Sequence, residues 1–333
     1  MSWVNLSTTV LQSDANIMLF SVDTRAVRAP NARQHHVGQL EISGTTVLYA
    51  LPRSGAPDIE VVAFPGDAVA NSLWQPLQGA VGNHPHAGGL LSVLHSKLSQ
   101  AHAGRHALFV VEPTQVTAQG FAVFESLLPS TTASGEPAAG YNARGLPASR
   151  QLHGLLAHVW SAVAPERAAP APAPLVVCGF SKGGVVCNQL LAEVAQLPDV
   201  PADQPGAAQL LARVTAVHLL DVGLSCRGAY LTDPAVATAL GRQCAASELR
   251  VCLHGTPRQW RDPSRRWLGM EKERSLAVLR GAGVRVACRE YFEDEPPSLE
   301  MHFRCVDAFD LALQPPAEDE AVGRLRQIAL RPL

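Results

Sequence analysis

Short apolar runs alternate with longer amphipathic stretches along this chain, and the alternation predicts a mainly parallel sheet with helices on both faces. Strands are expected at Gly38–Ile42, Thr46–Ala50, Ile59–Phe64, His106–Glu112, Leu175–Cys178, Val214–Leu220, Leu249–His254 and Val284–Tyr291. Helical periodicity is found at Leu90–Leu98, Ser149–Val163, Gly184–Leu197, Leu276–Gly281, His302–Leu313 and Ala321–Ala329. The fold class predicted from this order is α/β.

The length of 333 residues fits one large α/β domain, with an N-terminal extension over residues 1–34 and the domain itself over 35–333. Residues 113–148 form a long connection, which is typical of functional loops. We expect this connection, together with residues 222–247, to cover a site and set its specificity. The Pro- and Ala-rich residues 164–174 join a helix to a strand, so we place no domain boundary there.

Composition excludes several classes of protein. Hydrophobic residues make up 47% and charged residues 17% of the chain, which is a globular composition. A net charge of -2, no basic tail and 5% aromatic residues argue against a nucleic-acid partner. No apolar run approaches the roughly 18 residues of a transmembrane helix, and the N-terminus lacks the pattern of a secretory signal.

The seven cysteines are odd in number and form no C-x-x-C pair, so neither a disulfide framework nor a zinc site is expected. We interpret them as small buried hydrophobic residues of an intracellular protein. His35-His36 and His84-Pro85-His86 have no carboxylate or cysteine at ligand spacing and are expected on the surface. The sequence therefore predicts no metal and no cofactor.

The pentapeptide Gly179-Phe180-Ser181-Lys182-Gly183 matches G-x-S-x-G. About 0.1 such matches are expected by chance in a chain of this length, so the string alone is weak. Its position between a predicted strand and a predicted helix is the setting in which the motif exposes a nucleophilic serine. We therefore predict Ser181 as the nucleophile of an α/β-hydrolase fold, against the alternative of a Gly-rich turn without chemistry.

A serine needs a base, and in this fold the triad follows the order Ser, Asp or Glu, His. His302 is the only histidine after His254, so its position selects it as the base. We expect Asp262, in the connection after the strand Leu249–His254, to be the acid that orients His302. Asp221, at the end of the preceding strand, is the alternative.

An oxyanion hole requires two backbone N–H donors that point at the developing charge. The amide of Lys182, directly after the nucleophile, is predicted to be the first. The second is expected from Gly66-Asp67-Ala68, the loop after the strand Ile59–Phe64, where Gly66 permits a close approach of backbone to substrate. An ordinary turn at this position is the alternative interpretation.

Three motifs in this order resemble the chromosome-two open-reading-frame-sixty-nine family, a eukaryotic group of α/β-hydrolase-like proteins associated with mitochondria. They are Phe64-Pro65-Gly66-Asp67, Gly179-Phe180-Ser181-Lys182-Gly183 and Glu295-Pro296-Pro297-Ser298-Leu299-Glu300-Met301-His302-Phe303. The resemblance covers about residues 35–313. It implies the hydrolase fold, Ser181 as nucleophile, His302 as base, Gly66 near the oxyanion hole and a mitochondrial location; without it, a cytoplasmic location is expected.

These features together predict a serine hydrolase that acts on an acyl ester, thioester or amide, with a small acyl compound as its partner. The alternative is a non-catalytic binding or scaffold protein on the same fold, because fold alone does not fix function. Acyl transfer to an acceptor other than water is a further alternative.

Overall fold

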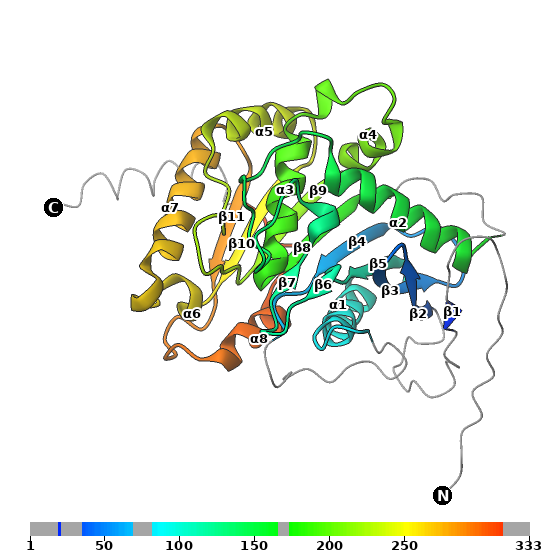
Figure 1. The fold of residues 1–333 in the computed structure, drawn as a ribbon, viewed down its shortest axis with the longest axis horizontal. Coiled ribbons are helices and arrows are strands. Elements are labelled where there is room, and N and C mark those ends of the chain that lie inside the picture. Colours follow the sequence, from blue (N-terminus) through cyan, green and yellow to red (C-terminus); the bar gives the residue numbers. More distant parts are fainter. Residues whose placement is uncertain (1–18, 21–34, 69–81, 166–172, 316–333) are drawn as a thin grey trace, which may run out of the picture.

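A nine-stranded sheet crosses the protein in the computed structural model, which describes residues 19–20, 35–68, 82–165 and 173–315 (Figure 1). The strand order is β1-β2-β3-β5-β4-β8-β9-β10-β11. The bounds are β1 Leu19–Phe20, β2 His35–Ile42, β3 Thr45–Pro52, β4 Ile59–Phe64, β5 His106–Val111, β8 Leu175–Phe180, β9 Val214–Leu220, β10 Arg250–Gly255 and β11 Val286–Glu290. The predicted C-terminal helix Ala321–Ala329 and most of the predicted N-terminal extension lie outside the described residues.

Strand direction divides the sheet into two parts. From β5 to β11 every neighbouring pair is parallel, whereas β1, β2 and β3 join the sheet through antiparallel pairs. This order, with its parallel centre and antiparallel edge, is that of the α/β-hydrolase fold, so the predicted fold class is confirmed. A short hairpin of β6 (Gln115–Val116) and β7 (Ala122–Val123) stands apart from the main sheet.

Helices cover both faces of the sheet, because successive side chains of a strand point to opposite sides. Side chains of α1 and α8 pack on one face, and those of α2, α3, α4, α5 and α7 pack on the other. The bounds are α1 Ala87–Ala101, α2 Pro147–Val163, α3 Gly184–Val194, α4 Pro205–Ala212, α5 Pro234–Ala246, α6 Pro257–Trp260, α7 Arg266–Gly281 and α8 Leu299–Ala308.

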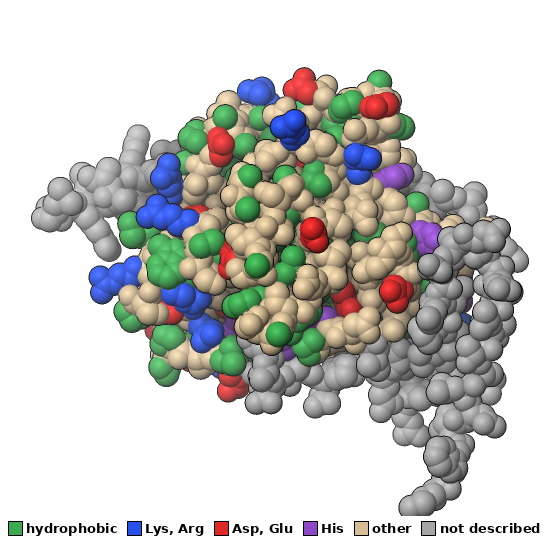
Figure 2. Space-filling view, viewed as in Figure 1, with side chains coloured by type: hydrophobic (Ala, Val, Ile, Leu, Met, Phe, Trp, Pro, Cys, Tyr) green, Lys and Arg blue, Asp and Glu red, His purple; other side chains and the backbone are tan. Residues whose placement is uncertain are grey.

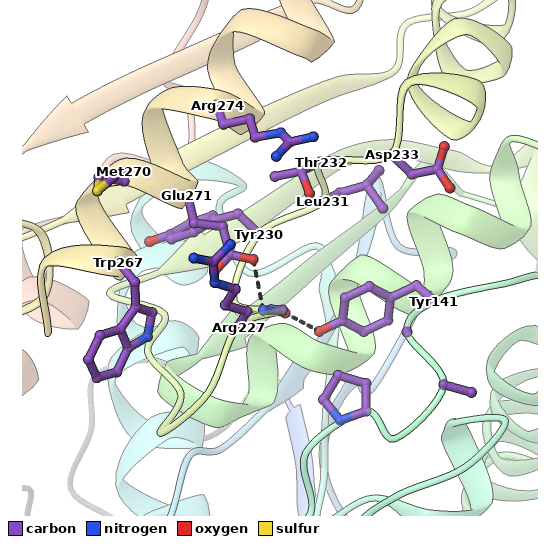
Figure 3. A pocket seen from close by; sticks show the side chains of 14 residues that line it. Tyr141, Arg227, Tyr230, Leu231, Thr232, Asp233, Trp267, Met270, Glu271 and Arg274 are labelled. Carbon is purple, nitrogen blue, oxygen red and sulfur yellow. Dashed lines mark hydrogen bonds between the residues drawn. The ribbon is translucent and has the colours of Figure 1, made fainter.

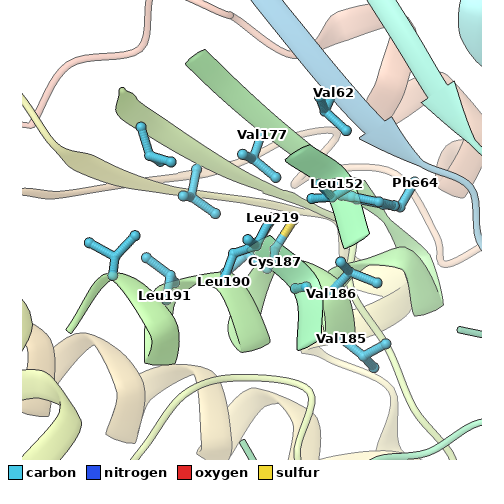
Figure 4. Close-up of a cluster of buried hydrophobic side chains, with 14 of the residues drawn as sticks. Val62, Phe64, Leu152, Val177, Val185, Val186, Cys187, Leu190, Leu191 and Leu219 are labelled. Atoms are coloured by element: carbon cyan, nitrogen blue, oxygen red, sulfur yellow. The ribbon is translucent and has the colours of Figure 1, made fainter. Parts of the chain in front are cut away.

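The core is densest where α3 packs on β8 and β9. Every residue of β8 and of α3 is buried. Val177 and Leu219 of the two strands meet Val186 and Leu190 of the helix (Figure 4). An apolar strand at the centre of a parallel sheet is buried on both faces, which explains why this strand has no alternating polar positions. The turn that joins β8 to α3 is thereby fixed at both ends.

Several element bounds differ from the predicted ones. The helix α8 begins at Leu299, three residues before the predicted start, because the Ser298 side chain accepts the N–H of Met301 at 3.1 Å and caps it. His302 consequently lies inside the helix rather than at its first position. The helices α4 and α5 were not predicted, since their Ala- and Gly-rich sequences carry little contrast between apolar and polar faces.

The histidines predicted to lie on the surface are largely buried, which corrects the sequence interpretation. His35, His84 and His86 are at most 2% exposed, and His36 is half-buried. The His86 ring packs against Phe303 of α8, with 5.2 Å between ring centroids. These residues stand in polar-looking stretches, and the apolar surfaces that cover them come from distant parts of the chain.

Burial also sets the charge state of the histidine rings. It lowers the pKa of His84 to about 3, of His95 to about 4, of His106 to about 2 and of His218 to about 3. These rings stay neutral in the folded protein, whereas the unfolded chain takes up protons below about pH 6.5. Their contribution to stability is therefore present above that pH and is lost as the pH falls toward the folded values.

We predict that the free energy of unfolding falls by roughly 1 kcal/mol for each of these four histidines between about pH 7.5 and about pH 5.5. Urea denaturation at the two pH values measures the fall. The variant His95→Gln has one titrating ring fewer and should lose correspondingly less stability. An unfolding free energy that is the same at both pH values would contradict the assignment of neutral buried rings.

Candidate active site

Ser181 lies in the tight turn between β8 and α3 and has a φ of 52°, a left-handed backbone conformation that is rare for residues other than glycine. Close packing around the turn requires the glycines that follow. A Cβ atom on Gly183 would lie 2.2 Å from the Phe64 carbonyl oxygen, and one on Gly184 would lie 2.4 Å from Val222. A strained serine on a strand-to-helix turn is the arrangement that the G-x-S-x-G motif predicts.

His302 and Asp221 meet across the carboxyl end of the sheet. The Nδ1 atom of His302 lies 2.6 Å from Oδ2 of Asp221. Asp221 directly follows β9, has a φ of 45° and is fully buried. Its carboxylate also accepts the backbone N–H of Thr256 at 2.7 Å and the Thr256 hydroxyl at 3.0 Å. A buried carboxylate held by three hydrogen bonds can fix the orientation of an imidazole and stabilise its charged form.

The expectation that Asp262 is the partner of His302 is wrong, and the alternative Asp221 occupies that place. Asp262 caps the short helix that begins at Pro263, accepting the N–H and hydroxyl of Ser264 at 2.8 and 2.6 Å. It also pairs with Arg265 at 2.9 Å. Hydrogen bonds from Ser264 and Arg265 lower the pKa of Asp262 to about 2. The helix α6, which follows β10 directly, carries Asp262 away from the end of the sheet.

The loop after β4 approaches Ser181 closely, as predicted from its sequence. A Cβ atom on Gly66 would lie 2.5 Å from Cβ of Ser181, so only glycine fits there. The backbone N–H of Lys182 stands in the first turn after Ser181, where N–H groups lack acceptors within the helix. The turn that carries this N–H lies in close contact with the Gly66 backbone.

Ser181 and His302 line one cavity of about 220 Å³. No hydrogen bond joins the two side chains within the described part of the chain; in unliganded enzymes such bonds are often long and shorten when substrate binds. The His302 ring is 6% exposed and packs against the Phe180 ring, with 4.5 Å between centroids. The other residues that line the cavity are Asp67, Gly223, Leu224, Ser225, Arg258, Gln259, Arg265, Leu299 and Phe303.

The side chain of Lys182 was not foreseen as part of the site, because a lysine is usually exposed. It is 1% exposed, and its Nζ lies 3.2 Å from Asp67 Oδ1 and 3.8 Å from Glu136 Oε1. It also donates to the Ser134 carbonyl at 2.6 Å. Burial raises the pKa of Asp67, and the Lys182 charge opposes that rise. One cation thus connects the serine turn, the loop after β4 and the connection 113–148.

The two connections predicted to cover the site have different positions. Residues 223–225 line the cavity, whereas no residue of 113–148 does so among those described. The connection 113–148 instead contacts residues next to the cavity through Glu136. The Glu136 carboxylate lies 3.8 Å from Lys182 Nζ and accepts the Ser225 hydroxyl at 3.2 Å. Further parts of the wall come from the segment after β10, through Arg258, Gln259 and Arg265, and from α8. The sequence pointed to both segments, but in the segment after β10 it singled out Asp262, which does not line the cavity.

A larger cavity of about 610 Å³ lies nearby and contains neither Ser181 nor His302 (Figure 3). Gly228 is one of its lining residues; its N–H donates to the Glu271 carboxylate of α7 at 2.7 Å, and its carbonyl accepts the Tyr141 hydroxyl. Burial raises the pKa of Glu271. These contacts fix the loop after β9 between α7 and the connection 113–148.

Two buried groups have the donor atoms to hold a metal ion: His35, His95 and His106, and His218, Cys252 and His254. In each group the ligand atoms lie within 4.8 Å of one another. None of these residues lines the cavity at Ser181. Their rings hydrogen-bond one another, as His95 and His106 do at 2.9 Å, so they serve as mutual partners inside the core.

Within the described ranges, no helix combines the length and the apolar character that crossing a membrane requires.

Comparison with known proteins gives one family. The profile of the C2orf69 family matches residues 157–285. The mitochondrial protein C2orf69 homolog of Danio rerio is 33% identical over 266 residues, which cover 75% of this chain and 72% of that protein. The homolog of Mus musculus is 35% identical over 138 residues, 41% of this chain and 36% of that protein. The names of these relatives confirm the predicted mitochondrial localisation.

Structural comparison matches this protein to solved structures of esterases and hydrolases. Esterase Est22 has a TM-score of 0.42 at 13% identity, over 89% of this chain and 80% of its own. The siderophore hydrolase EstB from Aspergillus nidulans has a TM-score of 0.42 at 14% identity, over 88% of this chain and 99% of its own.

The buried position of Lys182 leads to a stability prediction. Lys182→Met leaves the Asp67 carboxylate without its cation and should lower the free energy of unfolding by about 3 kcal/mol. The double variant Lys182→Met/Asp67→Asn removes both charges and should recover much of that loss. Arg105→Met, which breaks the pair between Arg105 and Asp58 on the exposed surface, is the control and should cost less than about 1 kcal/mol. Equal losses in the two single variants, measured by urea denaturation, would contradict the role of Lys182.

Proposed function

Because the chain belongs to the C2orf69 family and has the α/β-hydrolase fold, we propose that it is a serine hydrolase of acyl esters, thioesters or amides. The observation that carries the proposal is the 2.6 Å hydrogen bond between His302 and a fully buried Asp221, beside the strained Ser181. A buried ion-pairing carboxylate behind a histidine that faces a cavity is costly to maintain, and it serves acid–base chemistry directly.

The mechanism follows from the positions of these groups. The Ser181 hydroxyl attacks the substrate carbonyl carbon, and Nε2 of His302 accepts the proton that Ser181 releases. Asp221 holds Nδ1 of the ring, so that the free Nε2 faces the cavity, and it stabilises the imidazolium. The backbone N–H groups of Lys182 and of the Gly66-Asp67 loop stabilise the oxyanion.

The second half of the reaction uses the same residues. The His302 imidazolium donates its proton to the leaving group, and an acyl group remains on Ser181. His302 then takes a proton from water, which attacks the acyl carbon, and returns that proton to the Ser181 oxygen as the bond to the acyl group breaks, so that a carboxylic acid and free Ser181 are released. An acceptor other than water would turn the same intermediate into a transferase product, and identification of the released acyl compound distinguishes the two reactions.

A fluorophosphonate probe tests the proposed nucleophile, because it reacts covalently only with an activated serine. We expect the native full-length chain to be labelled between about pH 6 and about pH 9, and Ser181→Ala to remain unlabelled. Failure to label the native chain across this range, or equal labelling of Ser181→Ala, would refute the hydrolase and favour a binding or scaffold protein on this fold.

The same assay separates the two aspartates. Asp221→Asn should slow labelling by on the order of 10³- to 10⁴-fold, because the amide favours the wrong tautomer of His302. Asp262→Asn should label within about threefold of the native rate, because asparagine caps the helix at Pro263 about as well as aspartate does. Slower labelling in Asp262→Asn than in Asp221→Asn would reverse the assignment of the acid.

A further inference from the structure

Arg258 carries a positive charge in the wall of the Ser181 cavity that no described residue neutralises. The described residues place no carboxylate within 4.0 Å of its guanidinium, and its buried Nε atom has no hydrogen-bond partner among them. Its neighbour Arg265 differs, because it pairs with Asp262 at 2.9 Å and donates to the Arg258 carbonyl at 3.2 Å. A partly buried cation without a partner is unfavourable until an anion reaches it.

Three neighbouring charges act on Arg258, and they do so in opposite directions. Burial, followed by the nearby Arg265 guanidinium, lowers the pKa of Arg258, while Asp221 and Asp262 oppose that shift. Neither aspartate is free to serve as its partner, since Asp221 binds Thr256 and His302 and Asp262 binds Arg265. The two guanidinium groups therefore repel each other across the same wall, and a bound anion would relieve that repulsion.

The rest of the cavity suits a small amphipathic compound. Apolar side chains of Leu224, Leu299 and Phe303 line it together with Arg258. Its volume of about 220 Å³ lies below the roughly 300 to 1,000 Å³ of pockets that hold drug-sized ligands. A short carbon chain with one anionic group matches both the apolar lining and the unpaired guanidinium.

The surface around this part of the molecule is also basic. The segment 257–281, which covers α6 and α7, contains seven Lys and Arg residues and three Asp and Glu residues. Figure 2 shows Lys and Arg side chains gathered on the side of the molecule where these helices lie. The balanced charge of the whole chain conceals this local excess. Such a surface attracts anions and raises their rate of encounter with a neighbouring site.

We propose that Arg258 binds an anionic group of the substrate, so that the compounds processed at Ser181 are short acyl derivatives bearing a carboxylate or a phosphate. This inference rests on the proposed hydrolase function for the reaction, but the anion site itself stands on the geometry of Arg258. A guanidinium offers paired N–H donors that match the oxygens of either anion. Arg258 thus acts as a residue that determines specificity.

Two esters of equal chain length test the proposal with the full-length chain: para-nitrophenyl hexanoate, which is neutral, and the para-nitrophenyl monoester of adipic acid, which ends in a carboxylate. We expect kcat/KM for the anionic ester to exceed that for the neutral ester about tenfold, the effect of one charge-assisted hydrogen-bonded pair. Arg258→Gln should abolish this ratio, Arg258→Lys should retain part of it, and the exposed neighbour Arg266→Gln should leave it unchanged.

An unchanged ratio in Arg258→Gln, with kcat/KM for both esters reduced equally, would overturn the proposal, because Arg258 would then act through Asp221 alone. Thermal unfolding of each variant identifies any loss that comes from misfolding. Inhibition of the native protein by adipate and by methyl phosphate distinguishes the two anions, since the preferred class should inhibit at the lower concentration and lose its effect in Arg258→Gln.

A binding measurement on a variant without Ser181 tests the anion site independently of the proposed hydrolase function. Calorimetric titration of Ser181→Ala with adipate and with methyl phosphate should give binding of at least one of them, and Ser181→Ala/Arg258→Gln should weaken it about tenfold. Binding that depends on Arg258 in a protein that hydrolyses neither ester would refute the hydrolase and leave the anion site standing. Absent binding, or binding unaffected by Arg258→Gln, would refute the anion site.

Discussion

The hydrogen bond between Asp221 and His302 is the interaction on which the candidate site depends. It joins the residue after β9 to the helix α8, two parts of the chain separated by 81 positions. The carboxylate is buried, so it is stable as an anion only with all its oxygens bound, and Thr256 and His302 together supply those bonds. The position of α8, capped by Ser298, is thereby linked to the end of the sheet.

Packing around the serine turn provides the second constraint. The residues Gly66, Gly183 and Gly184 have no room for a Cβ atom, so the turn packs directly against the loop after β4 and against the Val222 side chain of the loop after β9. This contact holds Ser181 in its left-handed conformation, which would otherwise relax. Lys182 extends these contacts, because its buried ammonium group binds Ser134 and Glu136 of the connection 113–148 and holds that connection against the turn. The close packing of the glycines and the buried Lys182 thus maintain the strained backbone of Ser181 at this edge of the sheet.

The sheet, the turn at Ser181 and the loop at Gly66 were predicted from the sequence, since apolar runs and glycine-containing turns are recognised from residues that are neighbours along the chain. The carboxylate partner of His302 was predicted wrongly, because both Asp221 and Asp262 follow strands and only the path of the chain after β10 decides which one reaches His302. The position of Arg258 could not be predicted from the sequence, since its lack of a carboxylate partner among the described residues depends on which side chains the fold brings to it. For this reason, the partners and the burial of side chains that come from distant segments could not be predicted from the sequence.

Proton nuclear magnetic resonance of the imidazole N–H that His302 donates to Asp221 tests this hydrogen bond most directly. We expect one strongly deshielded proton in the native protein, absent from Asp221→Asn and present in Asp262→Asn, because a short hydrogen bond to a carboxylate withdraws electron density from that proton. A resonance that persists in Asp221→Asn, or that disappears in Asp262→Asn, would show that Asp221 is not the partner of His302.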